Sequence, residues 1–210
     1  DLEERHQGNW DNVIKKQFLN ARAFNYRNSS FIAPIWDLVN HKVKSLPFLV
    51  TEKGISTPNY PATNCEIVMQ YNNISALKRF FSYGFFSEET IVFSMPFSIY
   101  IGNLDFYISC KGLVLQNDSM RIERSGNKII LEGLPIADVN HPRLPYDYFD
   151  EILKRVDHIN IPKDLLLKIF QLNISIRKKI INESCLIENE TSNLLTKLML
   201  YEINLISSHN

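Results

Sequence analysis

The chain has 210 residues, of which 45% are hydrophobic and 22% are charged, a composition typical of a globular protein with enough apolar material to form a core. Its 23 lysines and arginines balance its 23 aspartates and glutamates, so no net charge attracts nucleic acid or an anionic membrane. No apolar run approaches the roughly 18 to 20 residues that span a bilayer. We therefore expect neither nucleic acid nor a membrane as a partner.

The three cysteines, Cys65, Cys110 and Cys185, are widely separated and show no Cys-x-x-Cys spacing. Neither a structural zinc site nor a disulfide framework is expected from this pattern. The first residues are charged and polar, unlike a signal peptide, so we expect a reducing, cytoplasmic location. The five histidines show no metal-binding helix spacing and no catalytic serine motif nearby, and there is no glycine-rich phosphate loop.

The first part of the chain predicts two helices separated by short strands. Apolar residues recur at three- and four-residue spacing over residues 9–24, which is typical of an amphipathic helix. A second, shorter helix is expected from Ser75, as its N-cap, through Phe81, with Gly84 as its C-terminal stop. Residues 53–64 are rich in glycine, proline and asparagine and are expected to be irregular. Strand-like runs are predicted at residues 31–35, 48–51 and 65–71.

Strand signals dominate residues 88–132, and helix signals follow from Pro145 onward. The tripeptide Ser125-Gly126-Asn127 suits a hairpin turn. Strands are predicted at residues 90–94, 97–101, 106–110, 113–116, 121–124 and 128–131. Helices are predicted at residues 148–156, 165–181 and 193–206, the last capped by Ser192 or Asn193. The change in composition predicts an α+β chain of two units, residues 1–86 and 87–210.

Polar residues at the end of an apolar run form the main candidate for a functional site. The segment Phe31-Ile-Ala-Pro-Ile-Trp-Asp-Leu-Val-Asn-His41 delivers Asp37, Asn40 and His41. In apolar surroundings such groups must be hydrogen-bonded to a neighbour, a water or a ligand. A strand that leads into a well hydrogen-bonded turn would explain this segment equally well. Three further segments accompany it in the chain: Arg22-Ala-Phe24, Glu66-Ile-Val-Met-Gln-Tyr71 and Tyr83-Gly-Phe85.

The order of these four segments resembles the C-terminal half of the SET-domain protein methyltransferases. The subclass it is similar to includes the Rubisco large-subunit lysine methyltransferase and the actin-histidine methyltransferase. In that family an Arg-Ala-Phe-like segment closes a helical insertion, followed by a Pro-x-x-Asp-x-x-Asn-His strand, a Glu-x-x-x-x-Tyr strand and a helix leading to Tyr-Gly-Phe. The resemblance covers residues 10 to about 86. It implies a β-rich SET half with a pseudoknot, followed by a substrate-binding unit that opens with strands and closes with helices.

The resemblance also implies S-adenosylmethionine as cofactor and methyl transfer to a lysine side chain of a protein substrate. Such a transfer depends on aligning the amine with the methyl group, and the lysine must be neutral although its free pKa is about 10.4. Tyr71 would be the active-site tyrosine, whose hydroxyl can accept weak hydrogen bonds from the methyl group. Asn40 and His41 would contact the cofactor, with Asp37, Leu38 and Val39 as the adjoining wall. Arg22 would approach the cofactor carboxylate. Tyr83 would line the cofactor pocket or the channel that holds the target side chain.

Several alternatives stay open at this point. Histidine could be the methylated side chain, or the chain could be a catalytically silent SET-like module that binds protein. The usual Gly-Glu turn is Asn64-Cys65 here, the glycine after the tyrosine is Asn72, and Lys42 follows His41. Residues 1–30 contain no Gly-x-Gly cofactor loop, so the N-terminal SET half is expected from the same longer protein. In an unrelated α+β interaction domain, Asn40, His41 and Tyr71 would lie far apart.

Overall fold

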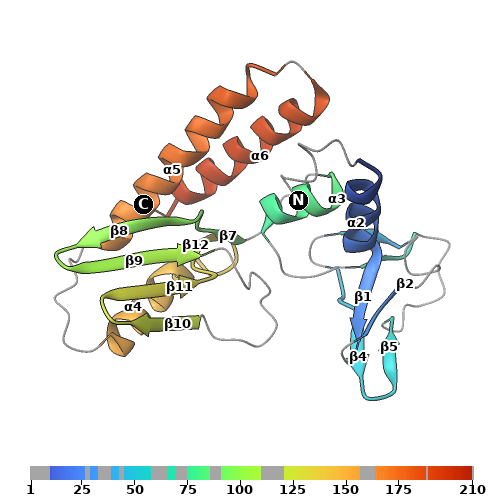
Figure 1. The fold of residues 1–210 in the computed structure, drawn as a ribbon, viewed down its shortest axis with the longest axis horizontal. Coiled ribbons are helices and arrows are strands. Elements are labelled where there is room, and N and C mark those ends of the chain that lie inside the picture. Colours follow the sequence, from blue (N-terminus) through green and yellow to red (C-terminus); the bar gives the residue numbers. More distant parts are fainter. Residues whose placement is uncertain are drawn as a thin grey trace.

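The structure is a computed structural model, which describes residues 10–26, 29–32, 39–42, 45–57, 66–69, 75–85, 91–109, 121–156, 164–187 and 189–209. In these residues the chain is a mixed α+β protein with five helices. Residues 10–85, which we call the N-terminal region, carry two helices and short strand pairs; residues 91–209, the C-terminal unit, carry a four-stranded sheet and three helices (Figure 1). No helix in the described residues is long and apolar enough to cross a membrane.

The described residues of the N-terminal region form three separate two-stranded pairs. β1 and β2 pair antiparallel, as do β4 and β5, whereas β3 and β6 pair in parallel. The predicted helix over residues 9–24 ends two residues early, because the chain continues directly into β1. Part of the stretch expected to be irregular forms β5. The elements are α2 (Trp10–Arg22), β1 (Ala23–Tyr26), β2 (Ser29–Ile32), β3 (Asn40–His41), β4 (Leu49–Thr51), β5 (Gly54–Ser56), β6 (Val68–Met69) and α3 (Ala76–Tyr83).

The C-terminal unit is built on a sheet with strand order β10-β11-β9-β8, in which β9 and β11 are parallel and the other neighbours antiparallel. Gly102 and Gly126 adopt φ of +58° in its two hairpin turns, a conformation that favours glycine. The predicted Ser-Gly-Asn hairpin is thereby confirmed. The strands are β7 (Ile91–Phe93), β8 (Phe97–Ile101), β9 (Leu104–Ser109), β10 (Arg121–Ser125), β11 (Lys128–Glu132) and β12 (Pro135–Asp138). Residues 113–116, predicted as a strand, lie outside the described residues.

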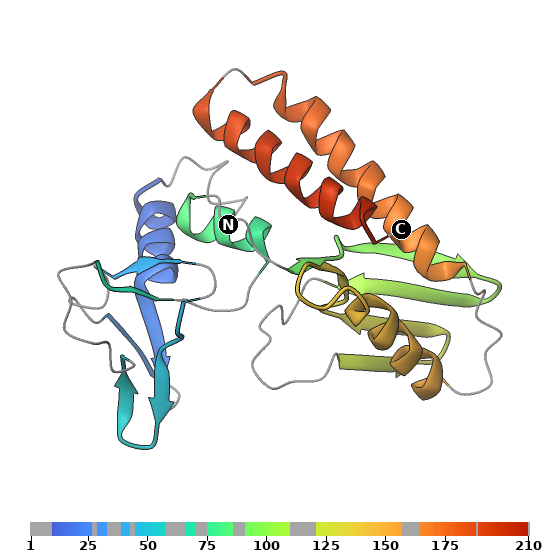
Figure 2. The same cartoon turned by 180° about the vertical axis from the view of Figure 1, so that it is seen from behind.

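Three helices complete the C-terminal unit: α4 (Leu144–Arg155), α5 (Leu165–Ser184) and α6 (Glu190–Ser207). α4 lies against one face of the sheet, and α5 and α6 lie side by side (Figure 2). The side chain of Asn189 accepts a hydrogen bond from the backbone N–H of Ser192 at 2.8 Å and caps α6. The predicted cap at Ser192 or Asn193 was therefore wrong, because both residues already lie inside the first turn.

The main hydrophobic core lies between the sheet and these helices. Its fully buried members come from alternate positions of β9 and β11 and from the inward faces of α4 and α5. They include Phe106, Ile108, Ile129, Leu131, Ile152, Leu165, Ile169 and Phe170. A second buried cluster joins Ala76 and Phe80 of α3 to Met95, Leu198 and Met199. α3 is thus the described element whose buried residues tie the N-terminal region to the C-terminal unit.

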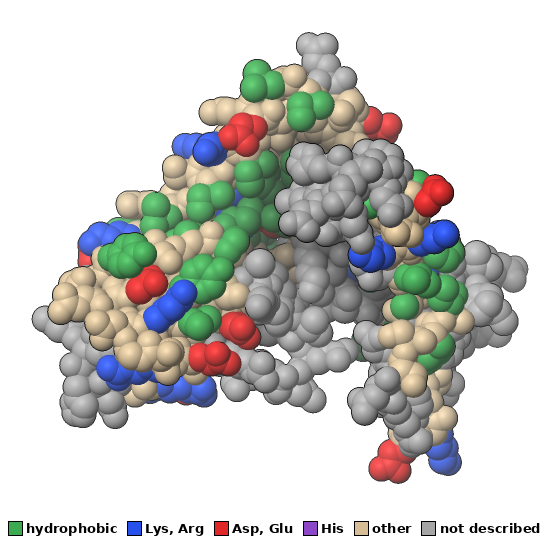
Figure 3. Space-filling model, viewed as in Figure 1, with side chains coloured by type: hydrophobic (Ala, Val, Ile, Leu, Met, Phe, Trp, Pro, Cys, Tyr) green, Lys and Arg blue, Asp and Glu red, His purple; other side chains and the backbone are tan. Residues whose placement is uncertain are grey.

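Several large apolar side chains of the N-terminal region are exposed to solvent. On α2, Ile14 is 63% exposed and both Phe18 and Leu19 are 50% exposed. Figure 3 shows apolar side chains at the surface in this part of the molecule. In β2, Phe31 and Ile32 are each 38% exposed, so this strand leaves part of its apolar surface open to solvent.

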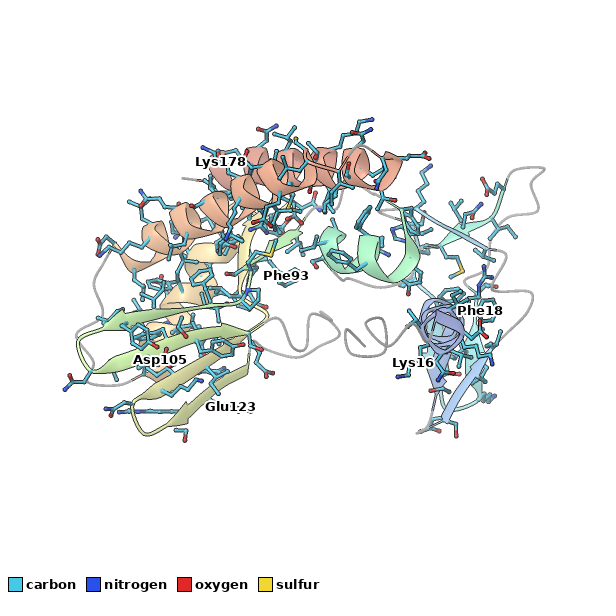
Figure 4. All side chains as sticks on the ribbon, turned by 45° about the horizontal axis from the view of Figure 1, so that its top comes forward. Lys16, Phe18, Phe93, Asp105, Glu123 and Lys178 are labelled. Carbon is cyan, nitrogen blue, oxygen red and sulfur yellow. The ribbon has the colours of Figure 1, made fainter. Side chains whose placement is uncertain are left out.

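A buried polar network holds β7 against the helix pair α5–α6. Arg177 and Glu202 are each 1% exposed and form an ion pair at 2.8 Å. The Arg177 guanidinium also donates to the carbonyl of Phe93 at 3.0 Å and to Oδ1 of Asn173 at 2.8 Å. Burial raises the pKa of Glu202, and Arg177 offsets part of that rise. Phe93 lies beneath α5, whereas Lys178 of that helix projects outward (Figure 4).

Candidate functional site

The parallel pairing of β3 with β6 brings two of the four motif segments together. Asn40 pairs with Val68 and His41 with Met69, and the backbone N–H of Lys42 donates to the carbonyl of Met69 at 3.1 Å. These strands are separated in the chain by the β4–β5 hairpin. The Asn-His pair therefore lies directly beside the segment that begins at Glu66.

A side-chain hydrogen bond adds to this backbone pairing. Nδ2 of Asn40 donates to Oε1 of Glu66 at 2.5 Å. Both side chains are exposed, and a bond to a carboxylate is stronger than one between neutral groups. The amide of Asn40 is thus linked to the segment that precedes β6.

The Tyr83-Gly84-Phe85 segment reaches the same place from the end of α3. The backbone N–H of Gly84 donates to the carbonyl of Phe80 at 2.8 Å, and Gly84 has φ of +77°, so it stops the helix as predicted. The ring centroid of Phe85 lies 5.9 Å from that of His41 and 6.0 Å from that of Tyr83. Both distances are in the range of favourable ring contacts.

Arg79 of α3 is a further site residue, and it was not predicted from the sequence. It is 0% exposed, and its Nη1 atom lies 3.5 Å from Nδ1 of His41. The signal was present in the chain: Arg79 is three residues after Ala76 and four before Tyr83, on the inward helix face. A cation on an apolar helix face is rare without a specific partner. We name Asn40, His41, Glu66, Arg79, Tyr83 and Phe85 the His41 cluster.

The remaining predicted residues have varied outcomes. Val39 is half-buried and directly precedes β3. Arg22 is the last residue of α2 and is exposed, and its guanidinium carbon lies 4.9 Å from the centroid of the Phe18 ring. Its predicted contact with a cofactor stays a prediction. Asp37, Leu38 and Tyr71 lie outside the described residues.

The His41 cluster offers an amide, an imidazole, a buried guanidinium and two aromatic side chains from three chain segments. Hydrogen-bonding groups beside aromatic rings are typical of sites for small organic ligands. Among the described residues, no three His, Cys, Asp or Glu side chains are grouped so that they could hold a metal ion. Comparisons with protein-family models, curated proteins and solved structures find no significant match to this chain.

Proposed function

We propose that this chain belongs to an S-adenosylmethionine-dependent protein N-methyltransferase of the SET type, which methylates a lysine side chain of a protein substrate. The observation that carries the proposal is the parallel pairing of Asn40–His41 with Val68–Met69. It brings the Asn-His motif beside the strand that leads to Tyr71. A chance similarity of short motifs gives no reason for these two segments to be neighbours.

A second observation supports the same proposal. Phe85, from the Tyr-Gly-Phe motif, packs its ring against His41. Three of the four segments that resemble the SET family are therefore adjacent, although Asn40 and Phe85 are 45 positions apart in the chain. An unrelated interaction domain would not require these segments to converge.

The residues of the His41 cluster fit the chemistry of the proposed cofactor. Asn40 and His41 supply hydrogen-bonding groups, and Tyr83 and Phe85 supply aromatic surface for a planar ring. When bound, S-adenosylmethionine would supply a methyl group on a positively charged sulfur. Arg79 is a cation beside His41, whereas Arg22 is proposed to approach the carboxylate of the cofactor.

Tyr71 is proposed as the active-site tyrosine. It follows Met69 by two residues, so chain connectivity limits the distance between their Cα atoms to about 7.6 Å. Met69 is itself fully buried and pairs with His41. A tyrosine hydroxyl can accept weak hydrogen bonds from a polarised methyl group, and an apolar channel would favour the neutral form of a lysine nucleophile.

The C-terminal unit is proposed to bind the protein substrate, with the boundary between units near residue 86. A cytoplasmic location and an N-terminal SET half within the same longer protein are parts of the proposal. They follow from the resemblance and the cysteine pattern alone.

Calorimetric titration of the full-length protein with S-adenosylmethionine tests the proposal. We expect saturable binding, and we expect Tyr71→Phe to lower methyl transfer at least tenfold. Tyr100→Phe is a matched control, because Tyr100 lies on β8 and is 74% exposed. No detectable binding, together with unchanged methylation in Tyr71→Phe, would refute the proposal.

The same experiment separates the alternatives. Binding without any methyl transfer would indicate a catalytically silent module. Mass spectrometry of the methylated product distinguishes lysine from histidine as the target.

A further inference from the structure

The buried guanidinium of Arg79 has a consequence for the chemistry of His41. Arg79 is 0% exposed, in a helix that packs against the C-terminal unit through its neighbour Phe80. A buried cation is costly unless polar groups compensate it. One polar atom at its Nη1 is Nδ1 of His41, at 3.5 Å.

The roles of the two nitrogen atoms follow from their chemistry. A guanidinium has only N–H donors, accepts no hydrogen bond and is not deprotonated in proteins. The neighbouring Nδ1 atom must therefore present its lone pair, because an N–H there would face another N–H and a positive charge. In a neutral imidazole the proton then resides on Nε2.

We propose that Arg79 is a positioning residue that fixes His41 as the neutral tautomer with its proton on Nε2. The hydrogen-bond donor of the ring is then Nε2, an atom that is buried in this structure.

Two further contacts restrict the ring to the orientation that this role requires. The backbone of His41 is paired with Met69, and the ring packs against Phe85 at 5.9 Å with an interplanar angle of 32°. The Nε2 atom is itself buried. A 180° flip of the ring would put its Cδ2 carbon where Nδ1 lies and would turn Nδ1 away from Arg79.

This inference goes beyond the proposed function and does not depend on it. The tautomer is a property of the chain without any ligand, so it is measured in the absence of S-adenosylmethionine and of substrate. A chain that transfers no methyl group can still carry the His41 proton on Nε2. A chain that carries it on Nδ1 can still transfer a methyl group, so the two proposals fail independently.

Two-bond ¹H–¹⁵N correlation spectra of the ¹⁵N-histidine-labelled full chain test the inference. His41→Gln assigns the signal among the five histidines. We expect the wild-type pattern of a proton on Nε2 near neutral pH. A pattern with the proton on Nδ1, or on both nitrogen atoms, would overturn the inference.

Substitutions at position 79 test the role of the guanidinium itself. Arg79→Lys retains a donor-only side chain and should keep the wild-type pattern. Arg79→Gln can turn its carbonyl oxygen toward the ring, so a measurable share of molecules should carry the proton on Nδ1. An unchanged pattern in a folded Arg79→Gln protein would overturn the role of Arg79. If that variant does not fold, the wild-type and Arg79→Lys spectra still decide the question: the Nε2 pattern in both supports the inference, and an Nδ1 pattern in either overturns it.

Discussion

The C-terminal unit and the N-terminal region contain similar kinds of element but bury their apolar residues very differently. Strands β8 to β11 form one continuous sheet whose inner face packs against α4 and α5. In its described residues the N-terminal region has three separate strand pairs and leaves Phe18 and Ile14 at least half exposed. Isolated two-stranded pairs are marginally stable in water. The comparison indicates that the C-terminal unit provides most of the stability, and that the N-terminal region depends on it through α3.

The largest effect is expected from breaking the buried ion pair of the C-terminal unit. Arg177→Met leaves Glu202 without its charged partner in an apolar interior, and such changes cost about 3–5 kcal/mol. Urea unfolding would measure the loss of unfolding free energy. Lys178→Ala is the matched control, because Lys178 is exposed on the same helix. A loss below about 1 kcal/mol in Arg177→Met would show that the network contributes little to stability.

A somewhat smaller effect is expected from disconnecting the two regions. Phe80 is 5% exposed and packs with Leu198 and Met199 of α6, whereas its neighbour Phe81 is 61% exposed. Phe80→Ala should cost about 3 kcal/mol and should make the N-terminal region cleavable by protease while the C-terminal unit stays folded. Phe81→Ala should cost less than about 1 kcal/mol. Equal protease sensitivity of the two variants would contradict the linking role of α3.

The pH dependence of stability should reveal the buried carboxyl of the C-terminal unit. Burial raises the pKa of Glu202 above its ordinary value of 4.5, and Arg177 offsets part of that rise. The folded chain therefore holds this proton more tightly than the unfolded chain. The contribution of Glu202 to stability is fully present below 4.5 and is lost as the pH rises through the folded-state pKa.

The measurement compares wild type with Glu202→Gln. The free energy of unfolding of wild type minus that of the variant should fall as the pH rises through this window. A difference that stays constant or increases would contradict the direction of the pKa shift.

The smallest losses of stability are expected from removing one polar contact in each region. Asn189→Ala removes the cap of α6 and should lower the free energy of unfolding of the C-terminal unit by about 1 kcal/mol. Glu66→Gln weakens the exposed bond to Asn40 and should cost at most about 0.5 kcal/mol. Thermal unfolding of both variants measures the difference. A larger loss in Glu66→Gln would mean that the N-terminal region contributes more stability than its burial indicates.

Periodicity predicted the elements whose residues alternate or recur on one face. The helix expected over residues 165–181 is α5, and the strand expected at residues 97–101 is β8. β12 was not predicted, because all four of its residues are buried and it begins with Pro135, so no alternation marks it. β1 was missed because Phe24 continues the helical spacing of α2.

The candidate site was predictable only in part, for a physical reason. Asn40, His41 and Tyr83 were selected from the resemblance, and the pairing of β3 with β6 now brings Asn40 and His41 beside the strand that leads toward Tyr71. Such a two-residue parallel pair depends on tertiary contacts and leaves no periodic pattern in the chain. Arg79 was missed because a lone basic residue in a helix is normally assigned to the solvent.

Neighbouring positions of α3 face two different parts of the molecule. Arg79 meets His41, and Phe80 meets α6. A rigid helix cannot move one of these side chains without moving the other. If a ligand at His41 and a protein on α6 both prefer the same position of α3, each raises the affinity of the other by the same factor. One helical turn of α3 is thus the place where such a coupling would pass between the two halves of the chain.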